Sequence, residues 1–152
     1  KINLKSLLEK VTLYMVERLP KTSKTNIILT IKKNIKLSDV NIMGDPVLLS
    51  WAFENIIKNS IDAIKKEKGE ILIKVNIEND FVYISFIDNG KGIKRNNWKN
   101  IFKPGYSTKK RGWGLGLSLA QRIVIEIHKG DIMIIDSSAK GTEIQIQLNQ
   151  MQ

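Results

Sequence analysis

The chain has 152 residues, enough for one domain with a sizeable core, and its hydrophobic fraction of 42% is ordinary for a globular protein. Its pattern includes neither an apolar run of membrane-spanning length nor an opening signal peptide, and its composition does not indicate disorder. The lack of cysteine excludes disulfides and thiolate metal sites, and is compatible with a reducing compartment.

The formal net charge of +10 has the sign that nucleic-acid-binding proteins carry. Lysines, however, are spread over most segments and do not gather on one helix or arm. This distribution favours a solvated, lysine-rich surface over a polyanion-binding face, and a nucleotide site would also attract part of the charge. We therefore expect no nucleic-acid partner and no membrane contact by this domain.

Apolar residues at three- and four-residue steps predict helices, and alternation of apolar and polar residues predicts strands. Pro20 ends the first helix, whereas Asp45 as N-cap and Pro46 as first residue begin the second. In chain order, the predicted elements are a helix at Leu4–Leu19, strands at Asn26–Lys33 and Asn41–Met43, a helix at Pro46–Lys66, a hairpin of strands at Glu70–Glu78 and Phe81–Asp88, a short helical turn at Asn97–Ile101, a helix at Gly114–Lys129, and strands at Ile132–Asp136 and Thr142–Leu148.

This order of elements predicts an α/β two-layer sandwich. We expect a mixed sheet of about five strands, three main helices on one face, and a flexible lid before the last helix. The lid corresponds to the basic, poorly periodic segment Lys94–Arg111. No internal repeat or linker divides the sequence, so residues 1–152 are expected to form a single domain.

The helix predicted at Pro46–Lys66 has two faces of different composition. A wide apolar stripe suits packing on a sheet. Asn55, Asn59 and Asp62 share another face, because steps of four and three residues return to the same side. Helix geometry leaves two interpretations open for these polar groups, exposure to water or a ligand site. Trp51 is interpreted as a packing residue.

Two glycine-rich stretches are candidates for ligand binding. Asp88–Gly92 offers an acidic acceptor beside backbone that can approach a ligand closely, although an ordinary turn would explain the same residues. Gly112–Leu117 places backbone N–H groups at a helix start, where phosphate oxygens are stabilised. It lacks the Lys-Ser/Thr pair of a Walker loop and the preceding strand of a Rossmann turn, so neither standard nucleotide fold fits.

In combination, these motifs resemble the ATP-binding catalytic domain of sensor histidine kinases, over essentially the whole chain. This is the GHKL or Bergerat group, shared with type II topoisomerases, MutL and an ATP-dependent chaperone. Residues 54–63 resemble the N box, 88–93 the G1 box, 101–109 the F box and 111–118 the G2 box. Gly141-Thr142-Glu143 is similar to the family's Gly-Thr entry into the final strand.

The resemblance implies that the domain binds ATP and Mg²⁺ and transfers the γ-phosphoryl group to a histidine. Asp88 would accept a hydrogen bond from the adenine amino group, with Thr142 nearby through water. Asn59 would bind Mg²⁺, and Asn55, Asn59 and Lys109 would be the catalytic residues. Phe102–Lys110 would form the mobile lid. The implied nucleotide-binding residues are Asn55, Lys58, Asn59, Asp62, Asp88, Gly90, Gly92, Ile93, Phe102, Ser107, Thr108, Lys109, Gly112, Gly114, Leu115, Gly116, Leu117 and Thr142.

Two residues depart from the patterns of the group. ATP-hydrolysing relatives carry a Glu four residues before the metal-binding Asn, whereas here Asn55 stands there, and an amide is no general base. Glu54 is rotated from that position by roughly 100° around the helix. We therefore expect slow hydrolysis. Asp62 replaces a Lys common in the kinases, which resembles the nitrogen-regulation branch and leaves several candidates for contact with the γ-phosphate: Lys58, Lys109, Lys110 and Arg111.

His128 is the only histidine and lies near the end of a predicted helix, where its interpretation is structural. With one His and no Cys, no metal site is expected apart from Mg²⁺ bound with nucleotide. The resemblance implies that the dimerisation and phosphoacceptor domain is missing from this chain, that the isolated domain is monomeric and cytoplasmic, and that a response regulator acts downstream. Anchoring of the parent protein in the inner membrane is left open. The alternatives are another GHKL member, either a protein-serine kinase or a slow ATPase, and a nucleotide-regulated docking module.

Overall fold

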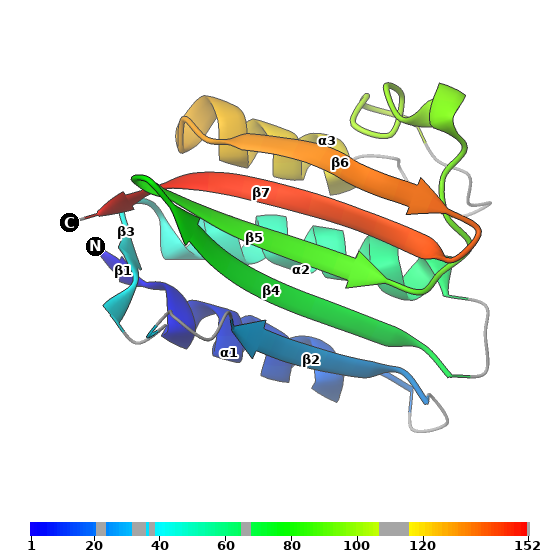
Figure 1. The fold of residues 1–152 in the computed structure, drawn as a ribbon, viewed down its shortest axis with the longest axis horizontal. Helices are drawn as coiled ribbons and strands as arrows, with labels where there is room; N and C mark the ends of the chain where they lie inside the picture. Colours follow the sequence, from blue (N-terminus) through cyan, green and yellow to red (C-terminus); the bar gives the residue numbers. More distant parts are fainter. Residues whose placement is uncertain (21–23, 32–35, 37–38, 65–67, 107–115, 152) are drawn as a thin grey trace.

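The computed structural model describes residues 1–20, 24–31, 36, 39–64, 68–106 and 116–151. In this part of the chain a β-sheet forms one layer, and the helices form a second layer on one of its faces (Figure 1). The α/β two-layer sandwich predicted from the order of the elements is confirmed.

Within the described residues the sheet contains seven strands: β1 (Ile2–Asn3), β2 (Asn26–Ile31), β3 (Asn41–Ile42), β4 (Glu70–Glu78), β5 (Phe81–Asp88), β6 (Asp131–Ser138) and β7 (Gly141–Met151). Their order is β1-β3-β7-β5-β4-β2, and β6 also pairs with β7. The pair of β2 and β4 is parallel, and the other pairs are antiparallel. The predicted mixed sheet is confirmed, but the prediction of about five strands is wrong.

The difference in strand number comes from elements too short to show a pattern. β1 has two residues, which cannot display the alternation by which strands are identified. β7 is longer than predicted because its last residues also pair: Asn149 lies opposite Phe81, and Gln150 lies opposite Ile42 of β3. These pairings are set by the tertiary fold and not by local sequence.

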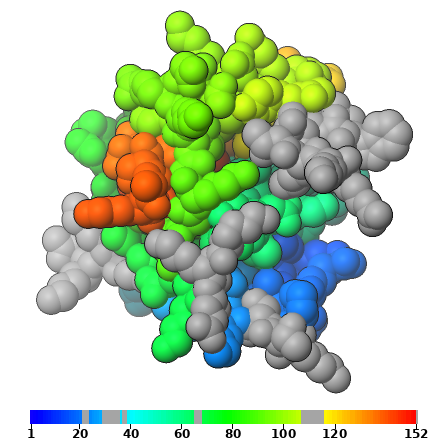
Figure 2. Space-filling view, turned by 90° about the vertical axis from the view of Figure 1, so that its right-hand side faces the viewer, coloured from blue at the N-terminus to red at the C-terminus, as the bar shows by residue number. Residues whose placement is uncertain are grey.

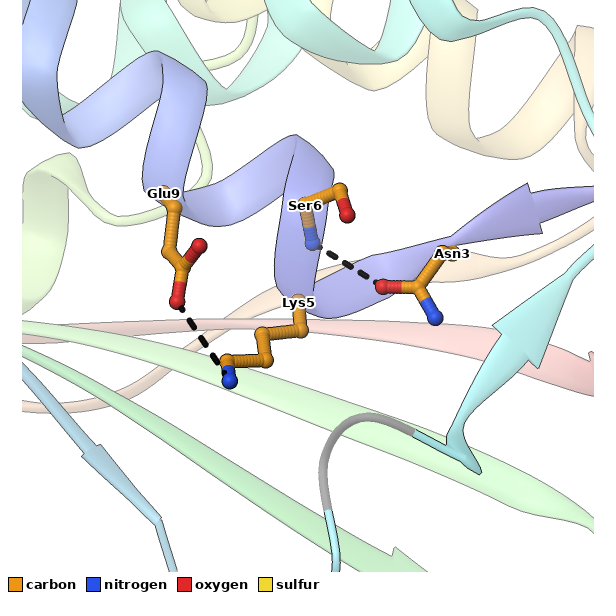
Figure 3. Close-up of polar contacts among 4 residues, drawn as sticks. All are labelled: Asn3, Lys5, Ser6 and Glu9. Atoms are coloured by element: carbon orange, nitrogen blue, oxygen red, sulfur yellow. Dashed lines mark hydrogen bonds and ion pairs between the residues drawn. The ribbon is translucent and has the colours of Figure 1, made fainter.

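The first two helices begin with side-chain caps. At the start of α1 (Leu4–Glu17), the side chain of Asn3 accepts a hydrogen bond from the backbone N–H of Ser6 at 3.0 Å (Figure 3). A Lys5–Glu9 ion pair of 3.8 Å spans the next turn of the helix (Figure 3). At the start of α2 (Pro46–Ala63), Asp45 accepts from two backbone N–H groups at 2.9 and 3.0 Å, as its position before Pro46 predicts.

The third helix changes its hydrogen-bond pattern partway along. α3 (Gly116–Gln121) continues as the π-helix η3 (Arg122–Ile127), where the prediction was one continuous helix. The backbone N–H of His128 donates to the carbonyl of Ile123, five residues earlier, at 3.1 Å. Apolar periodicity cannot distinguish so short a π-helical segment from an α-helix. Gly114 and Leu115, the predicted first residues of this helix, lie outside the described residues.

The core lies between the sheet and the helix layer, and the predicted apolar stripes of α1 and α2 supply much of it. Phe53 of α2 packs on Phe86 of β5 with ring centroids 5.8 Å apart. The prediction that Trp51 is a packing residue is wrong, because this residue of α2 is 50% exposed. The buried core includes Leu4, Leu7, Leu8, Val11, Leu49, Phe53, Ile56, Ile57, Ile71, Ile73, Val75, Val82, Ile84, Phe86, Ile144, Ile146 and Leu148.

Candidate nucleotide-binding site

The predicted site residues gather at one end of the sandwich. Asp88, the last residue of β5, lies opposite Thr142 near the start of β7, and the loop of residues 89–106 follows from there. Figure 2 looks onto this end of the molecule, where the loop appears in light green over the strand ends. Ser60, near the end of α2, approaches the same place from the helix layer, because its side chain hydrogen-bonds Asp88.

Asp88 is a buried carboxyl group with several donors aimed at it. Its side chain is 6% exposed, and its Oδ1 accepts a hydrogen bond from the backbone N–H of Gly90 at 2.8 Å. Burial raises the pKa of Asp88, while hydrogen bonds from the Gly90 backbone, the Ser60 side chain and the Thr142 backbone act in the opposite direction. Ser60 was not predicted as a site residue. The one signal in the sequence that could have identified it is its position as a polar residue within the apolar stripe of α2.

Two glycines allow backbone segments to meet beside Asp88. Gly92 has φ +80°, and a side chain there would collide with the carbonyl of Ser138. Gly141 has φ +141°, and a side chain there would collide with the carbonyl of Asp88. The turn between β6 and β7 can therefore lie directly against the end of β5 and its following loop. The sequence pattern identified Gly92, whereas nothing in it indicated which backbone it would face.

A chain of hydrogen bonds joins this turn to the loop after β5. The hydroxyl groups of Thr142 and Ser137 lie 2.7 Å apart, and Ser137 Oγ also accepts from the backbone N–H of Ile93 at 2.7 Å. The carbonyl of Ile93 accepts from the indole N–H of Trp98 at 3.0 Å. Asp88, Thr142 and Ile93, which were predicted together, are thus brought together. Ser137 and Trp98 were missed, because neither residue belongs to the recognised boxes.

The polar face of α2 meets the start of α3. The amide oxygen of Asn55 would lie 3.6 Å from a β-carbon placed on Gly116. Asn59 is half-buried one turn further along the same face, followed by the half-buried Asp62. Lys58 is exposed. Asn55 and Gly116, which lie far apart in the sequence, are therefore neighbours, as the predicted site requires.

The predicted lid is described only in its first part. It begins with the 3-10 helix η2 (Arg95–Asn97), slightly before the predicted turn at 97–101. Phe102 and Tyr106 are half-buried and pack against the core. Leu117, in the first turn of α3, is buried. The remaining predicted residues of the lid and G2 box lie outside the described residues: Ser107, Thr108, Lys109, Lys110, Arg111, Gly112, Gly114 and Leu115.

A groove of about 420 Å³ separates α2 from the end of α1. The groove is lined by Glu54, Asn55 and Lys58 of α2. Arg18, the C-cap of α1, lines its other side. Burial raises the pKa of Glu54, and the charge of Arg18 partly offsets this effect. Asn55 borders both this groove and Gly116. Glu54 belongs to the groove, which agrees with its predicted rotation from the position of the missing base.

His128 has a structural role, as predicted. Its Nε2 lies 3.0 Å from the backbone N–H of Asp45, and its Nδ1 lies 2.8 Å from the carbonyl of Ile123. A backbone N–H can only donate, so Nε2 accepts and Nδ1 carries the proton that Ile123 accepts. The imidazole thereby ties the end of η3 to the N-cap of α2, and both ring nitrogens are occupied by backbone partners.

The described part of the chain contains no cluster of three His, Cys, Asp or Glu side chains suited to a metal ion. A divalent cation there would depend on amide oxygens such as those of Asn55 and Asn59, together with ligand phosphates and water. These are the hard oxygen ligands that Mg²⁺ prefers. In the same described part, no helix is both long and apolar enough to cross a bilayer.

Comparison with known proteins decides the family. The family described as histidine kinase-, DNA gyrase B-, and HSP90-like ATPase matches residues 44–152, which include α2, the loop after β5, α3 and β7. The chain belongs to this family. The resemblance inferred from the four boxes is confirmed, whereas the assignment to a nitrogen-regulation branch stays a prediction.

Proteins and solved structures similar to the chain include sensor histidine kinases and sporulation kinases. Sporulation kinase C of Bacillus subtilis (strain 168) is 41% identical over 128 residues, covering 82% of this chain and 29% of that protein. The catalytic domain of histidine kinase ThkA, in a nucleotide-free form, has a TM-score of 0.84 at 23% identity and covers 98% of this chain and 93% of that one. Full-length ShkA in complex with AMPPNP has a TM-score of 0.84 at 21% identity, covering 98% of this chain and 30% of that one. The chain thus spans less than a third of the curated relative, and the structures establish the shared fold.

Proposed function

We propose that this domain binds Mg-ATP and transfers its γ-phosphoryl group to a histidine of a separate phosphoacceptor domain, within a two-component sensor kinase. The observation that carries the proposal is the buried carboxylate of Asp88, which accepts hydrogen bonds from α2, from β7 and from the loop after β5. It lies at the strand end where the resemblance implies the adenine base. A purely structural turn has no need of a buried carboxyl group, because burial disfavours its ionised form.

At the base end, Asp88 would accept a hydrogen bond from the exocyclic amino group of adenine. The donors already on Asp88 hold the carboxylate in position before a ligand arrives, which lowers the cost of ordering it on binding. Thr142 and Gly92 would lie beside the base. Adenine would be preferred over guanine, because guanine presents a carbonyl oxygen where adenine presents the amino group.

At the phosphate end, Asn55 and Asn59 would hold the metal and orient the triphosphate, and the first residues of α3 would lie against its oxygens. When bound, Mg²⁺ would neutralise phosphate charge and draw electron density from the transferred group. The amide oxygens on the polar face of α2 fit this ion. The contribution of Lys109 to the γ-phosphate, which the resemblance implies, forms part of the same proposal.

The polar face of α2, which carries Asn55 and Asn59, favours transfer of the γ-phosphoryl group to a histidine over hydrolysis of ATP. In the transfer step, a ring nitrogen of the acceptor histidine forms a bond to the γ-phosphorus while the bond from that phosphorus to the bridging oxygen of ADP breaks. A histidine is nucleophilic without a general base, whereas water requires activation. Asn55 cannot act as a base, and Glu54 lines the groove toward Arg18. The domain is therefore suited to holding ATP until an acceptor docks.

The acceptor histidine is proposed to belong to another domain. His128 is the only histidine of the chain, and its two ring nitrogens face the backbone of Asp45 and Ile123. A response regulator would then take the phosphoryl group from the phosphorylated acceptor. The isolated domain is proposed to be a monomer located in the cytoplasm.

The proposal is tested by calorimetric titration with a non-hydrolysable ATP analogue, with and without Mg²⁺. We expect saturable binding that Mg²⁺ strengthens and that Asp88→Asn weakens sharply. Release of ADP from ATP without an acceptor should be slow. Unchanged affinity in both Asp88→Asn and Asn59→Ala would refute the site, and rapid steady-state hydrolysis would favour an ATPase instead.

A further inference from the structure

The peptide groups of Ile93 are held from two sides by side chains outside the recognised boxes. Ser137 accepts the Ile93 N–H at 2.7 Å, and Trp98 donates to the Ile93 carbonyl at 3.0 Å. We propose that Ser137 and Trp98 are positioning residues that set the adenine selectivity of the site. This inference rests on the proposed function, because it concerns the same nucleotide site.

Ser137 connects Ile93 to the residue pair that would meet the base. Its hydroxyl lies 2.7 Å from that of Thr142, and Thr142 pairs directly with Asp88 across β7 and β5. Since Ser137 Oγ accepts from Ile93, its own proton can go to Thr142. The distance between Ile93 and the Asp88 carboxylate is then set through a continuous path of Ser137 and Thr142, and not by the loop alone.

Trp98 closes the loop from the other side. Indole is a donor only, so its N–H requires an acceptor in a half-buried position, and the Ile93 carbonyl is that acceptor. The backbone between them is tightly turned, with hydrogen bonds from Asn97 to Lys94 at 2.8 Å and from Trp98 to Arg95 at 3.2 Å. The guanidinium of Arg95 lies 4.2 Å from the centre of the Trp98 ring and covers it. The loop of residues 93–98 is therefore held together by its own hydrogen bonds and by the contact between Arg95 and Trp98.

The two hydrogen bonds that hold Ile93 would affect how well the site distinguishes adenine from guanine. A carboxylate rejects the guanine carbonyl only if the base edge is held close to it, because a base that can withdraw avoids the repulsion. Ile93 would form the wall that prevents such withdrawal. Loss of either hydrogen bond would leave the phosphate contacts in place and loosen this wall.

The test uses conservative variants with matched controls in the same chain. Trp98→Phe removes the indole N–H while retaining an aromatic ring, and Ser137→Ala removes one hydroxyl. Trp51→Phe changes a half-exposed tryptophan, and Ser138→Ala removes a neighbouring hydroxyl that accepts from Lys140 N–H within the turn. Each variant is titrated with non-hydrolysable ATP and GTP analogues, after its circular dichroism and thermal unfolding confirm folding.

We expect Trp98→Phe and Ser137→Ala each to weaken ATP-analogue binding about threefold to tenfold, the effect of one hydrogen bond. Their preference for the adenine analogue over the guanine analogue should fall by a similar factor, while both controls retain the preference. A purely structural role would weaken the two analogues equally, so an unchanged preference would overturn the inference. If the wild-type domain binds neither analogue, the proposed function fails first.

Intrinsic fluorescence gives a second measurement that does not depend on the folding of Trp98→Phe. In the double variant Trp51→Phe, Trp113→Phe, the remaining emission comes from Trp98 alone. Saturation with the ATP analogue should shift this emission, because the base would press on the loop that the indole closes. Emission that stays constant at full saturation would contradict the proposed position of Trp98.

Discussion

Replacement of Asp88 by Asn is the most direct test of the nucleotide site. The change keeps the size of the side chain but replaces one carboxylate oxygen by an NH₂ group. That group would face hydrogen-bond donors, since Gly90, Ser60 and Thr142 all donate to this carboxyl group. A hydrogen bond to a charged acceptor contributes about 1.5–3 kcal/mol, so we expect the dissociation constant of an ATP analogue to rise about 10- to 150-fold.

The assay is isothermal titration of both proteins at the same pH and salt, combined with denaturant unfolding without nucleotide. Because burial raises the pKa of Asp88, the folded state disfavours its charged form, and removal of that charge does not by itself destabilise the fold. Loss of affinity in a folded variant therefore reports the missing acceptor. A change in dissociation constant below about threefold, less than one neutral hydrogen bond supplies, would refute the assignment of Asp88 to the base.

The titration of Asp88 should make stability depend on pH. In the folded protein the pKa of Asp88 lies above the ordinary 3.8, so the free energy of unfolding of the wild type, relative to that of Asp88→Asn, should fall as the pH rises from 3.8 through the folded pKa. Urea unfolding of both proteins measures this difference. Nucleotide affinity should change in the opposite direction and weaken as the pH falls through the same range, because a protonated carboxyl is a poorer acceptor. Asn59→Ala should remove most of the Mg²⁺-dependent gain in affinity, whereas equal gains in variant and wild type would exclude Asn59 as the metal ligand. His128→Ala should lower the free energy of unfolding by about 1–3 kcal/mol, because it leaves the Asp45 N–H without its acceptor and removes one of the two donors to the Ile123 carbonyl, and it should leave nucleotide affinity unchanged.

The parts of the fold that sequence reasoning predicted are those with a strong local cause. The apolar stripe of α2 and the cap formed by Asp45 before Pro46 identified that helix and its start. Alternation identified β4 and β5 with their bounds, because each strand is long and buried on one face. Asp88 and Gly92 were predicted as site residues because a strand-end carboxylate and a close backbone approach each require a recognisable residue type. The structure shows the buried carboxyl and the close approach, and their contact with nucleotide stays a prediction.

The parts that were missed depend on contacts between distant segments. β1 and the last residues of β7 are strands only because another strand lies beside them. The π-helical turns of η3 follow from hydrogen bonds around His128, and the same apolar spacing would suit an α-helix. Ser137 was missed for a similar reason, since its function comes from lying beside Ile93, 44 residues away in the chain.

The two ends of the proposed site are built in different ways, and under the proposed function this difference would let one face of α2 favour transfer over hydrolysis. The base end is made of strand ends and a hairpin turn that meet backbone to backbone, so Asp88 is fixed by the sheet itself. The phosphate end is made of side chains on a helix, where a shift of one residue rotates a group by about 100°. Glu54 and Asn55 differ by that one step, and Glu54 lines the groove beside Arg18 whereas Asn55 also reaches Gly116. The carboxylate of Glu54, the nearest residue that could activate water, therefore lies toward α1. The side chain beside the start of α3 is the amide of Asn55, which can orient phosphate but cannot take a proton from water.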